Sequence, residues 1–319
     1  MFEYIITRPM GYIIEFIYNL VQNYGIAIIL FTIIIKMLLF PLNVKSQKAM
    51  RKQQKIQPIL QELQKKYAND KEKLNREMMK LYKENNISMS GGCLPMLIQM
   101  PILIGLYQVI QKPLSYLLHV DWSAPDVINR VKALRDTYAQ GALAGRTMED
   151  LANVNQINIS QWAAQAGYTD WVINFKMFFL DLANIPSTAM KYIGEVAQGN
   201  FEHLSIVLLL LIPILAVLSS IGSMKVSQAM SGQKKDKSKD ADTAAQMSNT
   251  MMWMMPVMTG FFTFTLPAGI GLYWMISSVL QIVQQLGLNI YFNNKKEDEV
   301  IVKIPESRQN TGKKRKKHR

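Results

Sequence analysis

Residues 27–43 read AIILFTIIIKMLLFPLN, an apolar run that holds one charged residue, Lys36. A bilayer core roughly 30 Å thick is crossed by a helix of about 20 predominantly apolar residues. A charge at the centre of such a helix costs roughly 2.5–3.5 kcal/mol on insertion scales, so intramembrane charges tend to face a partner or a water-filled cavity. The run therefore predicts a membrane helix, and Lys36 is its candidate functional residue.

Further apolar blocks of similar length follow along the chain. The protein has 319 residues, of which 49% are hydrophobic, yet its mean hydropathy is only +0.04 because the apolar residues are gathered into blocks between charged segments. Backbone polar groups in lipid must be satisfied internally, so the spans have to be helices. The sequence predicts an all-α, polytopic membrane protein with five transmembrane helices, at residues 25–43, 94–118, 204–224, 250–266 and 268–292.

The charges between these blocks predict the topology. Lys and Arg accumulate in the cytoplasmic loops of membrane proteins. Residues 45–93 contain 12 Lys and Arg, residues 293–319 contain ten, and residues 119–203 contain six against nine Asp and Glu. We therefore expect the N-terminus and the segment 119–203 outside the cell, and in the cytoplasm the hairpin 44–93, the loop 225–249 and the basic tail 293–319.

Within the N-terminal segment 1–24, the stretch 10–24 has the helical spacing of an amphipathic segment. Its apolar positions fall on one predicted face: Ile13, Phe16, Ile17, Leu20 and Tyr24. The start, MFEYIITRPMGY, has no compact apolar core before a small-residue cleavage site, so we expect it to stay on the protein. The pattern predicts a helix that lies in the outer membrane interface.

Residues 44–93 show two apolar stripes at helical spacing, separated by the polar break AND at 68–70. They predict two antiparallel helices with basic outer faces, with Ile59, Leu63 and Met78 in the stripes that pack on each other. One interpretation is a solvated spacer, since charge runs are usually solvated faces. The other is a docking device that meets lipid head groups, ribosomal RNA or a nascent chain.

Motifs for catalysis and for metal or cofactor binding are missing from the sequence. It has one cysteine, Cys93, and three scattered histidines, and no Walker A loop, HExxH or GxSxG motif occurs. We therefore expect no enzyme activity, no cofactor and no metal.

Four stretches carry a resemblance to a known family. They are YGIAIILFTIIIKMLLFPL at 24–42, GGCLPMLIQMPILIGLYQ at 91–108, MMPVMTGFFTFTLPAGIGLYW at 254–274 and QIVQQ at 281–285. Their order and topology resemble the YidC family of membrane protein insertases, which is related to the Oxa-type proteins of mitochondria, in a short form similar to that of Gram-positive bacteria. The resemblance covers about residues 12–118 and 174–292, and it implies a multi-pass protein of the bacterial cell membrane.

The resemblance also implies a mechanism. In that family five helices enclose a hydrophilic groove that is open to lipid and to the cytoplasm, and a cationic residue of the first helix attracts the polar end of a client. Lys36 stands where the family has an arginine, so the charge is kept while the planar five-donor fork is lost. The other groove candidates are polar or aromatic residues inside the predicted spans: Gln99, Ser220, Ser223, Trp274 and Gln281.

Each of these residues also has an ordinary interpretation. Lys36 lies nine residues before Lys45, or roughly 13 Å along a helix, and its side chain could snorkel toward the head groups. The glutamines and serines could make hydrogen bonds between helices. Trp274 could be an anchor at the outer interface.

Methionines gather in NTMMWMMPVM at 249–258. Thioether side chains adapt to irregular partners, so one hypothesis is a surface along which client segments pass, with Met252 as a probe position. Ordinary lipid contact is the alternative interpretation.

The tail ends in GKKRKKHR, whose core is Lys313, Lys314, Arg315, Lys316 and Lys317. Such a cluster is attracted to anionic lipids by about 1 kcal/mol per charge near the surface. The resemblance instead favours contact with ribosomal RNA, which weakens steeply with salt.

The resemblance thus implies a membrane insertase that moves hydrophobic segments of nascent membrane proteins into the bilayer, alone or with the Sec translocon, and we expect it to be a monomer. A secondary transporter that uses Lys36 as its coupling charge is the alternative. Such transporters tend to have two related halves with interrupted helices. No internal repeat is visible in the sequence.

Overall fold

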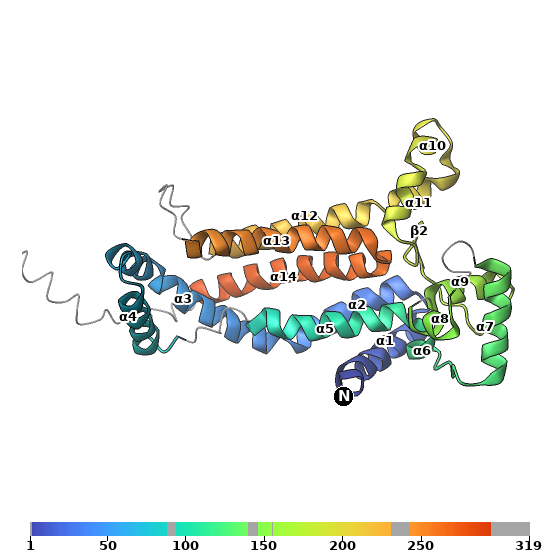
Figure 1. Ribbon diagram of the computed structural model, residues 1–319, viewed down its shortest axis with the longest axis horizontal. Helices are drawn as coiled ribbons and strands as arrows, with labels where there is room; N and C mark the ends of the chain where they lie inside the picture. The colour runs from blue at the N-terminus through green and yellow to red at the C-terminus, as the bar shows by residue number, and fades with distance from the viewer. Residues whose placement is uncertain (1, 88–93, 140–145, 155, 231–242, 295–319) are drawn as a thin grey trace, which may run out of the picture. The chain divides into compact units, whose positions relative to one another are not determined.

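The computed structural model describes residues 2–87, 94–139, 146–154, 156–230 and 243–294 (Figure 1). Side chains are described for all of these except residues 54, 94–98, 154, 230 and 243–252. Helices make up almost all of the regular structure in this part of the chain, together with one two-stranded hairpin. The chain divides into two compact units: residues 1–37, 99–223 and 242–281 form the first, and residues 38–98, 224–241 and 282–319 form the second.

The N-terminal segment of the first unit is helical, as the sequence predicts. A π-helical turn, η1 (Glu3–Thr7), continues into α1 (Arg8–Val21), which ends at Gln22 in the left-handed conformation. The face that packs inward contains Met10, Ile14, Ile17 and Tyr18. Phe16 and Leu20, predicted to share a face with Ile17, are 66% and 70% exposed, so the helix is apolar on both sides.

The helix of the first predicted span is interrupted before the predicted end of the span. α2 runs over Tyr24–Leu38, and the next helix, α3 (Phe40–Lys66), begins after a break at Leu39. Pro41 explains the break, because it has no N–H to donate to a carbonyl of the preceding turn and its ring clashes with that turn. Residues 40–43, predicted as the end of the span, therefore begin the following helix.

Proline also interrupts the second predicted span. α5 covers Leu94–Gln111, and the short helix α6 (Pro113–Leu117) follows after Lys112, whose dihedral angles lie outside the helical region. The third predicted span consists of α11 (Leu204–Leu208) and α12 (Leu211–Met230), and it extends past its predicted end at 224. The last two helices are α13 (Thr243–Thr265) and α14 (Ala268–Asn294).

Small residues allow three of these helices to approach closely in the first unit. A Cβ atom added to Gly271 of α14 would lie 2.6 Å from Ile212 of α12 and 3.4 Å from Thr263 of α13. Glycine at such a contact lets helix backbones approach, which is how helices associate in lipid without a hydrophobic driving force. Figure 1 shows α12, α13 and α14 running side by side.

One helical segment among the described residues, Phe201–Ala229, is by itself long and apolar enough to cross a membrane. α2 and the first part of α3 meet that standard only when they are taken together. α14 contains several polar residues that lower its mean hydropathy: Ser277, Ser278, Gln281, Gln284 and Gln285. The count of five transmembrane helices stays a prediction.

The first part of the segment between α6 and α11 packs on α1 and the start of α2, and its last helices contact α11. It contains α7 (Pro125–Tyr138), α8 (Met148–Val154), α9 (Gln156–Gln165), the strands β1 (Lys176–Met177) and β2 (Leu180–Asp181), and the short helices η3 (Pro186–Lys191), α10 (Ile193–Ala197) and η4 (Phe201–His203). Val131, Ile159 and Trp162 belong to the same buried core as Ile14 and Tyr24. The described residues of the segment 121–170 therefore contribute to the main core of this unit.

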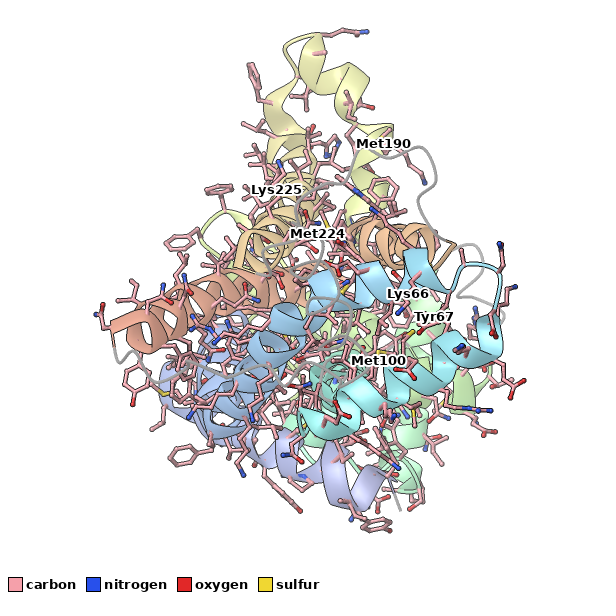
Figure 2. All side chains as sticks on the ribbon, turned by 90° about the vertical axis from the view of Figure 1, so that its left-hand side faces the viewer. Lys66, Tyr67, Met100, Met190, Met224 and Lys225 are labelled. Carbon is pink, nitrogen blue, oxygen red and sulfur yellow. The ribbon has the colours of Figure 1, made fainter. Side chains whose placement is uncertain are left out.

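The second unit contains the predicted helical hairpin. α3 and α4 (Lys71–Glu84) are joined by a short turn, in which the side chain of Asp70 accepts a hydrogen bond of 2.9 Å from the backbone N–H of Lys73. Figure 2 labels Lys66 and Tyr67 at this turn, where the ammonium group of Lys66 lies 5.2 Å from the centre of the Tyr67 ring. The two helices enclose their own apolar cluster: Ile56, Leu60, Leu81, Tyr82 and Ile87.

Candidate functional site

Lys36 lies in the last turn of α2 and is partly buried. One turn before it, Phe31 and Thr32 are buried at the centre of the first unit, and the hydroxyl of Thr32 donates to the carbonyl of Ile28 at 2.6 Å. The neighbours Met37 and Leu38 are 70% and 68% exposed. The cation is thus at the C-terminal end of a half-buried helix, where the carbonyl dipoles favour positive charge.

Gln99 makes a hydrogen bond between two of the predicted spans. Its side-chain amide on α5 donates to the hydroxyl of Tyr273 on α14 at 2.7 Å, and Tyr273 is only 2% exposed. Ser277, one turn further along α14, is buried and also interacts with this hydroxyl. Gln99, predicted as a groove residue from its position in an apolar run, is therefore joined to Tyr273 and Ser277, which were not among the predicted groove residues.

The polar residues of α14 share one face. Tyr273, Ser277 and Gln281 are spaced four residues apart, so they lie above one another on the helix. Tyr273 and Ser277 are buried, whereas Gln281 is exposed. The signal that could have found this stripe is the four-residue spacing of polar side chains in an apolar helix.

Trp274 follows Tyr273 on α14 and packs against α13. Its ring stacks on Phe262 of α13, with the ring centres 6.0 Å apart and the planes 7° from parallel. The indole is partly buried and contacts the main core of the unit. This packing links α13 to α14 next to the Gln99–Tyr273 bond.

The serines of α12 differ in burial. Ser223 is 7% exposed and Ser220 is partly exposed, while the hydroxyl of the neighbouring Ser219 donates to the carbonyl of Ala216. On α13, Thr259 and Thr263 are buried, and each donates to a carbonyl of the preceding turn. The threonine hydroxyls are therefore satisfied within their own helix.

The methionine-rich helix α13 has an apolar outer surface. Met254, Met255, Val257 and Met258 are between 45% and 69% exposed, as is Met100 on α5 at 47%. The side chain of Met252 lies outside the part of the chain that the structure describes. Exposure of this kind fits contact with lipid or with an apolar client segment.

In the helical hairpin α3–α4, the residues predicted to pack between the helices lie at the edge of the apolar cluster. Ile59, Leu63 and Met78 are partly buried and contact the cluster, whereas Ile56 and Leu60 are 1% and 5% exposed. Burial depends on how the facing helix is rotated, which the spacing within one helix does not determine.

The base of the hairpin is tied to the end of α14 inside the second unit. The guanidinium of Arg51 donates to the side chain and the carbonyl of Asn289 and to the side chain of Asn293, and it lies 4.8 Å from the centre of the Phe292 ring. Asn43 donates to the side chain of Gln284 at 3.2 Å. These contacts fix the start of α3 against α14, and the sequence analysis did not identify them.

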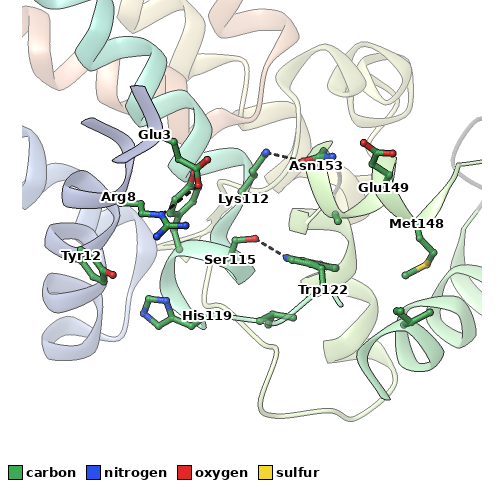
Figure 3. Close-up of a pocket in the computed structure, with 14 residues that line it drawn as sticks. Glu3, Arg8, Tyr12, Lys112, Ser115, His119, Trp122, Met148, Glu149 and Asn153 are labelled. Atoms are coloured by element: carbon green, nitrogen blue, oxygen red, sulfur yellow. Dashed lines mark hydrogen bonds and ion pairs between the residues drawn. The ribbon is translucent and has the colours of Figure 1, made fainter. Parts of the chain in front are cut away.

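A cavity of about 630 Å³ lies on the part of the first unit that is expected outside the cell, between η1, α1, α6 and α8 (Figure 3). Several of its polar groups interact with one another: Arg8 lies 3.6 Å from Glu3, Lys112 donates to Asn153, and Trp122 donates to Ser115. Ser115 also accepts from Gln156, so its hydroxyl has no base that could activate it among these partners. The lining includes none of the residues predicted for the groove.

The turn beside this cavity contains a carboxylate with a shifted pKa. The hydroxyl and the backbone N–H of Ser123 both donate to Asp121, and these two hydrogen bonds hold the pKa of its carboxyl below the usual value. The charged form of Asp121 therefore stabilises the turn between α6 and α7. Among the described residues, no group of three or more His, Cys, Asp and Glu side chains is arranged to hold a metal ion.

The tail residues Lys313, Lys314, Arg315, Lys316 and Lys317 lie outside the described residues, as does much of the loop 225–249. Their roles stay predictions.

Comparison with known proteins identifies the family. The family model described as 60Kd inner membrane protein matches residues 16–296. Membrane protein insertase YidC of Caldanaerobacter subterraneus subsp. tengcongensis is 31% identical over 280 residues, which are 88% of this chain and 92% of that protein. The proteins of the same name from Nitratidesulfovibrio vulgaris and Syntrophobacter fumaroxidans are 40% identical over 149 residues and 29% identical over 284 residues.

These last two relatives are longer than this chain, which spans 28% and 38% of their lengths. The matched part covers 45% of this chain in the first case and 89% in the second. The chain belongs to the 60Kd inner membrane protein family and is an all-α membrane protein related to the YidC insertases.

Proposed function

We propose that this protein is a membrane protein insertase that moves hydrophobic segments of newly made proteins from the cytoplasm into the bilayer, without a cofactor and without a covalent step. The proposal rests on one combined observation: the chain belongs to this family, and polar side chains lie inside its predicted membrane helices. The family match covers residues 16–296, and within it Lys36 and the Gln99–Tyr273 pair belong to predominantly apolar helices.

In this mechanism α2, α5, α11 with α12, α13 and α14 are the five spans. Lys36, Gln99, Ser220, Ser223, Trp274 and Gln281 line a hydrophilic groove that opens to the lipid and to the cytoplasm. The N-terminus lies outside the cell and the C-terminus inside. The exposed methionines of α13 supply an adaptable apolar surface beside the groove.

The driving force is a difference in solvation. A short polar client tail that crosses hydrocarbon alone carries a large penalty, which a wet cationic groove lowers. The client's apolar segment gains roughly 25 cal/mol per Å² when it reaches lipid. Insertion therefore needs no external energy for a client whose polar tail is short.

The proposal includes four kinds of contact partner. Nascent membrane proteins are the clients, the Sec translocon joins for clients with longer external parts, the basic tail contacts the ribosome, and the hairpin and tail meet anionic lipids. A monomer is the working unit, since one groove serves one client segment.

The direct test is reconstitution of the purified full-length chain into lipid vesicles. A single-span client with a short external tail is synthesised in the presence of these vesicles, and insertion is measured as protection of the tail from added protease. We expect clearly more protected tail than in protein-free vesicles with the same lipids. Equal protection in both would contradict the insertase function. If the vesicles instead took up a small solute in response to an ion gradient, the transporter alternative would be favoured.

A further inference from the structure

The hairpin β1–β2 has an unusual turn. Met177 pairs with Leu180, so Phe178 and Phe179 are the two residues of the turn. Turns of this length prefer Asn, Asp or Gly, because one or both positions need a positive φ. Phe178 occupies such a position with φ of 55°, which is unfavourable for a bulky side chain.

The two aromatic side chains point away from the protein. Phe178 is 93% exposed and Phe179 is 59% exposed. The flanking Met177 and Leu180 point the other way and pack on a buried cluster that includes Leu182, Leu209 and Leu272. The hairpin therefore has an apolar base that is buried and an apolar tip that the described part of the protein leaves uncovered.

The base of the hairpin is held at the first residues of α2. The side-chain amide of Asn23 donates to the carbonyl of Lys176 at 2.7 Å, and the backbone N–H of Tyr24 donates to the carbonyl of Asn174 at 2.9 Å. A Cβ atom added to Gly25 would lie 2.7 Å from Leu182 and 2.8 Å from Met177, so strand and helix are in close contact.

The other side of the hairpin base meets the first residues of α14. The backbone N–H groups of Gly269 and Ala268 donate to the carbonyls of Leu182 and Asn184. The hairpin is thus tied to the N-terminal ends of two helices that belong to the proposed set of spans. In the proposed topology both of these ends lie at the outer surface of the membrane.

We propose that Phe178 and Phe179 form an anchor that enters the outer lipid interface beside the ends of α2 and α14. Aromatic side chains concentrate at the water–lipid interface. The exposed Lys176 at the base of the tip suits the phosphate groups of the lipids. Backbone strain at a residue that glycine would fit better is typical of positions kept for a function of the side chain.

With this anchor, the β1–β2 hairpin has a structural role in the first unit. It joins the outer ends of α2 and α14 through backbone hydrogen bonds, and the lipid contact holds this junction at a fixed depth. The inference rests on the proposed membrane topology but not on the groove.

The test measures the depth of the turn in a bilayer. Cys93 is the single cysteine of the chain, so a Cys93→Ser background accepts one nitroxide spin label at Phe178→Cys, or in a second variant at Phe179→Cys. The labelled full-length protein is reconstituted into vesicles of phosphatidylcholine and phosphatidylglycerol at low protein content. Power-saturation spectroscopy then compares the accessibility of the label to oxygen, which concentrates in lipid, with that to a water-soluble nickel chelate.

A label at Lys132→Cys is the matched control, because Lys132 is an exposed and charged residue of α7 in the same unit. We expect the ratio of oxygen to nickel accessibility at positions 178 and 179 to exceed that at position 132 severalfold. Equal ratios at all three positions would overturn the anchor.

Two further outcomes would also overturn it. Protection from nickel that appears only at high protein content would indicate a second copy of the chain as the occupant. Protection that appears only in native membranes would indicate another protein. The insertion assay uses the unlabelled parent, so failure of the anchor and failure of the insertase function are read separately.

Discussion

The side-chain amide of Gln99 on α5 donates a hydrogen bond of 2.7 Å to the hydroxyl of Tyr273 on α14. The two residues are 174 positions apart in the sequence, and Tyr273 is 2% exposed. The bond joins two of the predicted spans at a buried point, so it both stabilises their packing and fixes the orientation of two polar side chains.

The Gln99–Tyr273 pair can be tested by a double-mutant cycle with Gln99→Leu and Tyr273→Phe. Hydrogen bonds between membrane helices contribute about 0.6 kcal/mol on average and about 1.7 kcal/mol at most, so we expect a coupling free energy in that range. Unfolding of the detergent-solubilised protein by a denaturing detergent measures it. Additive effects of the two substitutions would mean that the bond contributes nothing to stability.

Lys36 is tested by insertion of one client whose external tail is made acidic, neutral or basic. If Lys36 supplies a positive field to a wet groove, Lys36→Arg should preserve insertion, since both side chains carry the charge. Lys36→Ala should fail most with the acidic tail, and Lys36→Glu should be worse through repulsion.

A snorkelling lysine gives the opposite expectation for this series. Removing it would then be neutral or slightly favourable, because roughly 2–3 kcal/mol of burial cost disappears. If the Lys36→Ala variant inserts the client with each of the three tails as well as the parent protein does, Lys36 is not a groove residue.

The helical hairpin is tested by comparing substitutions at two depths of its cluster. Leu60 is 5% exposed and Leu63 is partly buried, so Leu60→Ala should destabilise the helix pair by roughly 2–5 kcal/mol and Leu63→Ala by less. Hydrogen exchange of the amides in α3 and α4 measures the difference.

Disruption of the same hairpin should also impair insertion. We expect Ile59→Asp with Leu63→Asp to reduce insertion, and charge reversal at the exposed Lys65 and Lys66 to have a smaller effect, because surface charges contribute little to stability. Normal insertion by the double Asp variant would show that the packed hairpin is dispensable.

Removal of residues 313–319 tests the basic tail. We expect less co-sedimentation with ribosomes at low salt, a loss that diminishes as salt is raised, and an unchanged melting temperature of the solubilised protein. Truncation that leaves ribosome binding the same at every salt concentration would rule out the tail as the contact.

The sequence by itself determined the helical class and the helical hairpin, and it singled out Lys36 as a charge inside an apolar run. Each of these follows from local properties: the length of an apolar run, the period of a stripe and the cost of a charge in lipid. The resemblance added the family, which the comparisons bear out over residues 16–296.

The tertiary structure decided which of these residues meet. That Gln99 bonds to Tyr273, that Ile56 and Leu60 lie deeper than Ile59 and Leu63, and that α1 packs through Ile14 with Phe16 facing outward all depend on how each helix is rotated toward its neighbours. The spacing along one helix does not determine which of its apolar side chains contact the neighbouring helix, because that depends on the rotation of both helices. The exposed pair Phe178 and Phe179 became visible for the same reason, because only a folded chain distinguishes an apolar residue that is covered from one that is not.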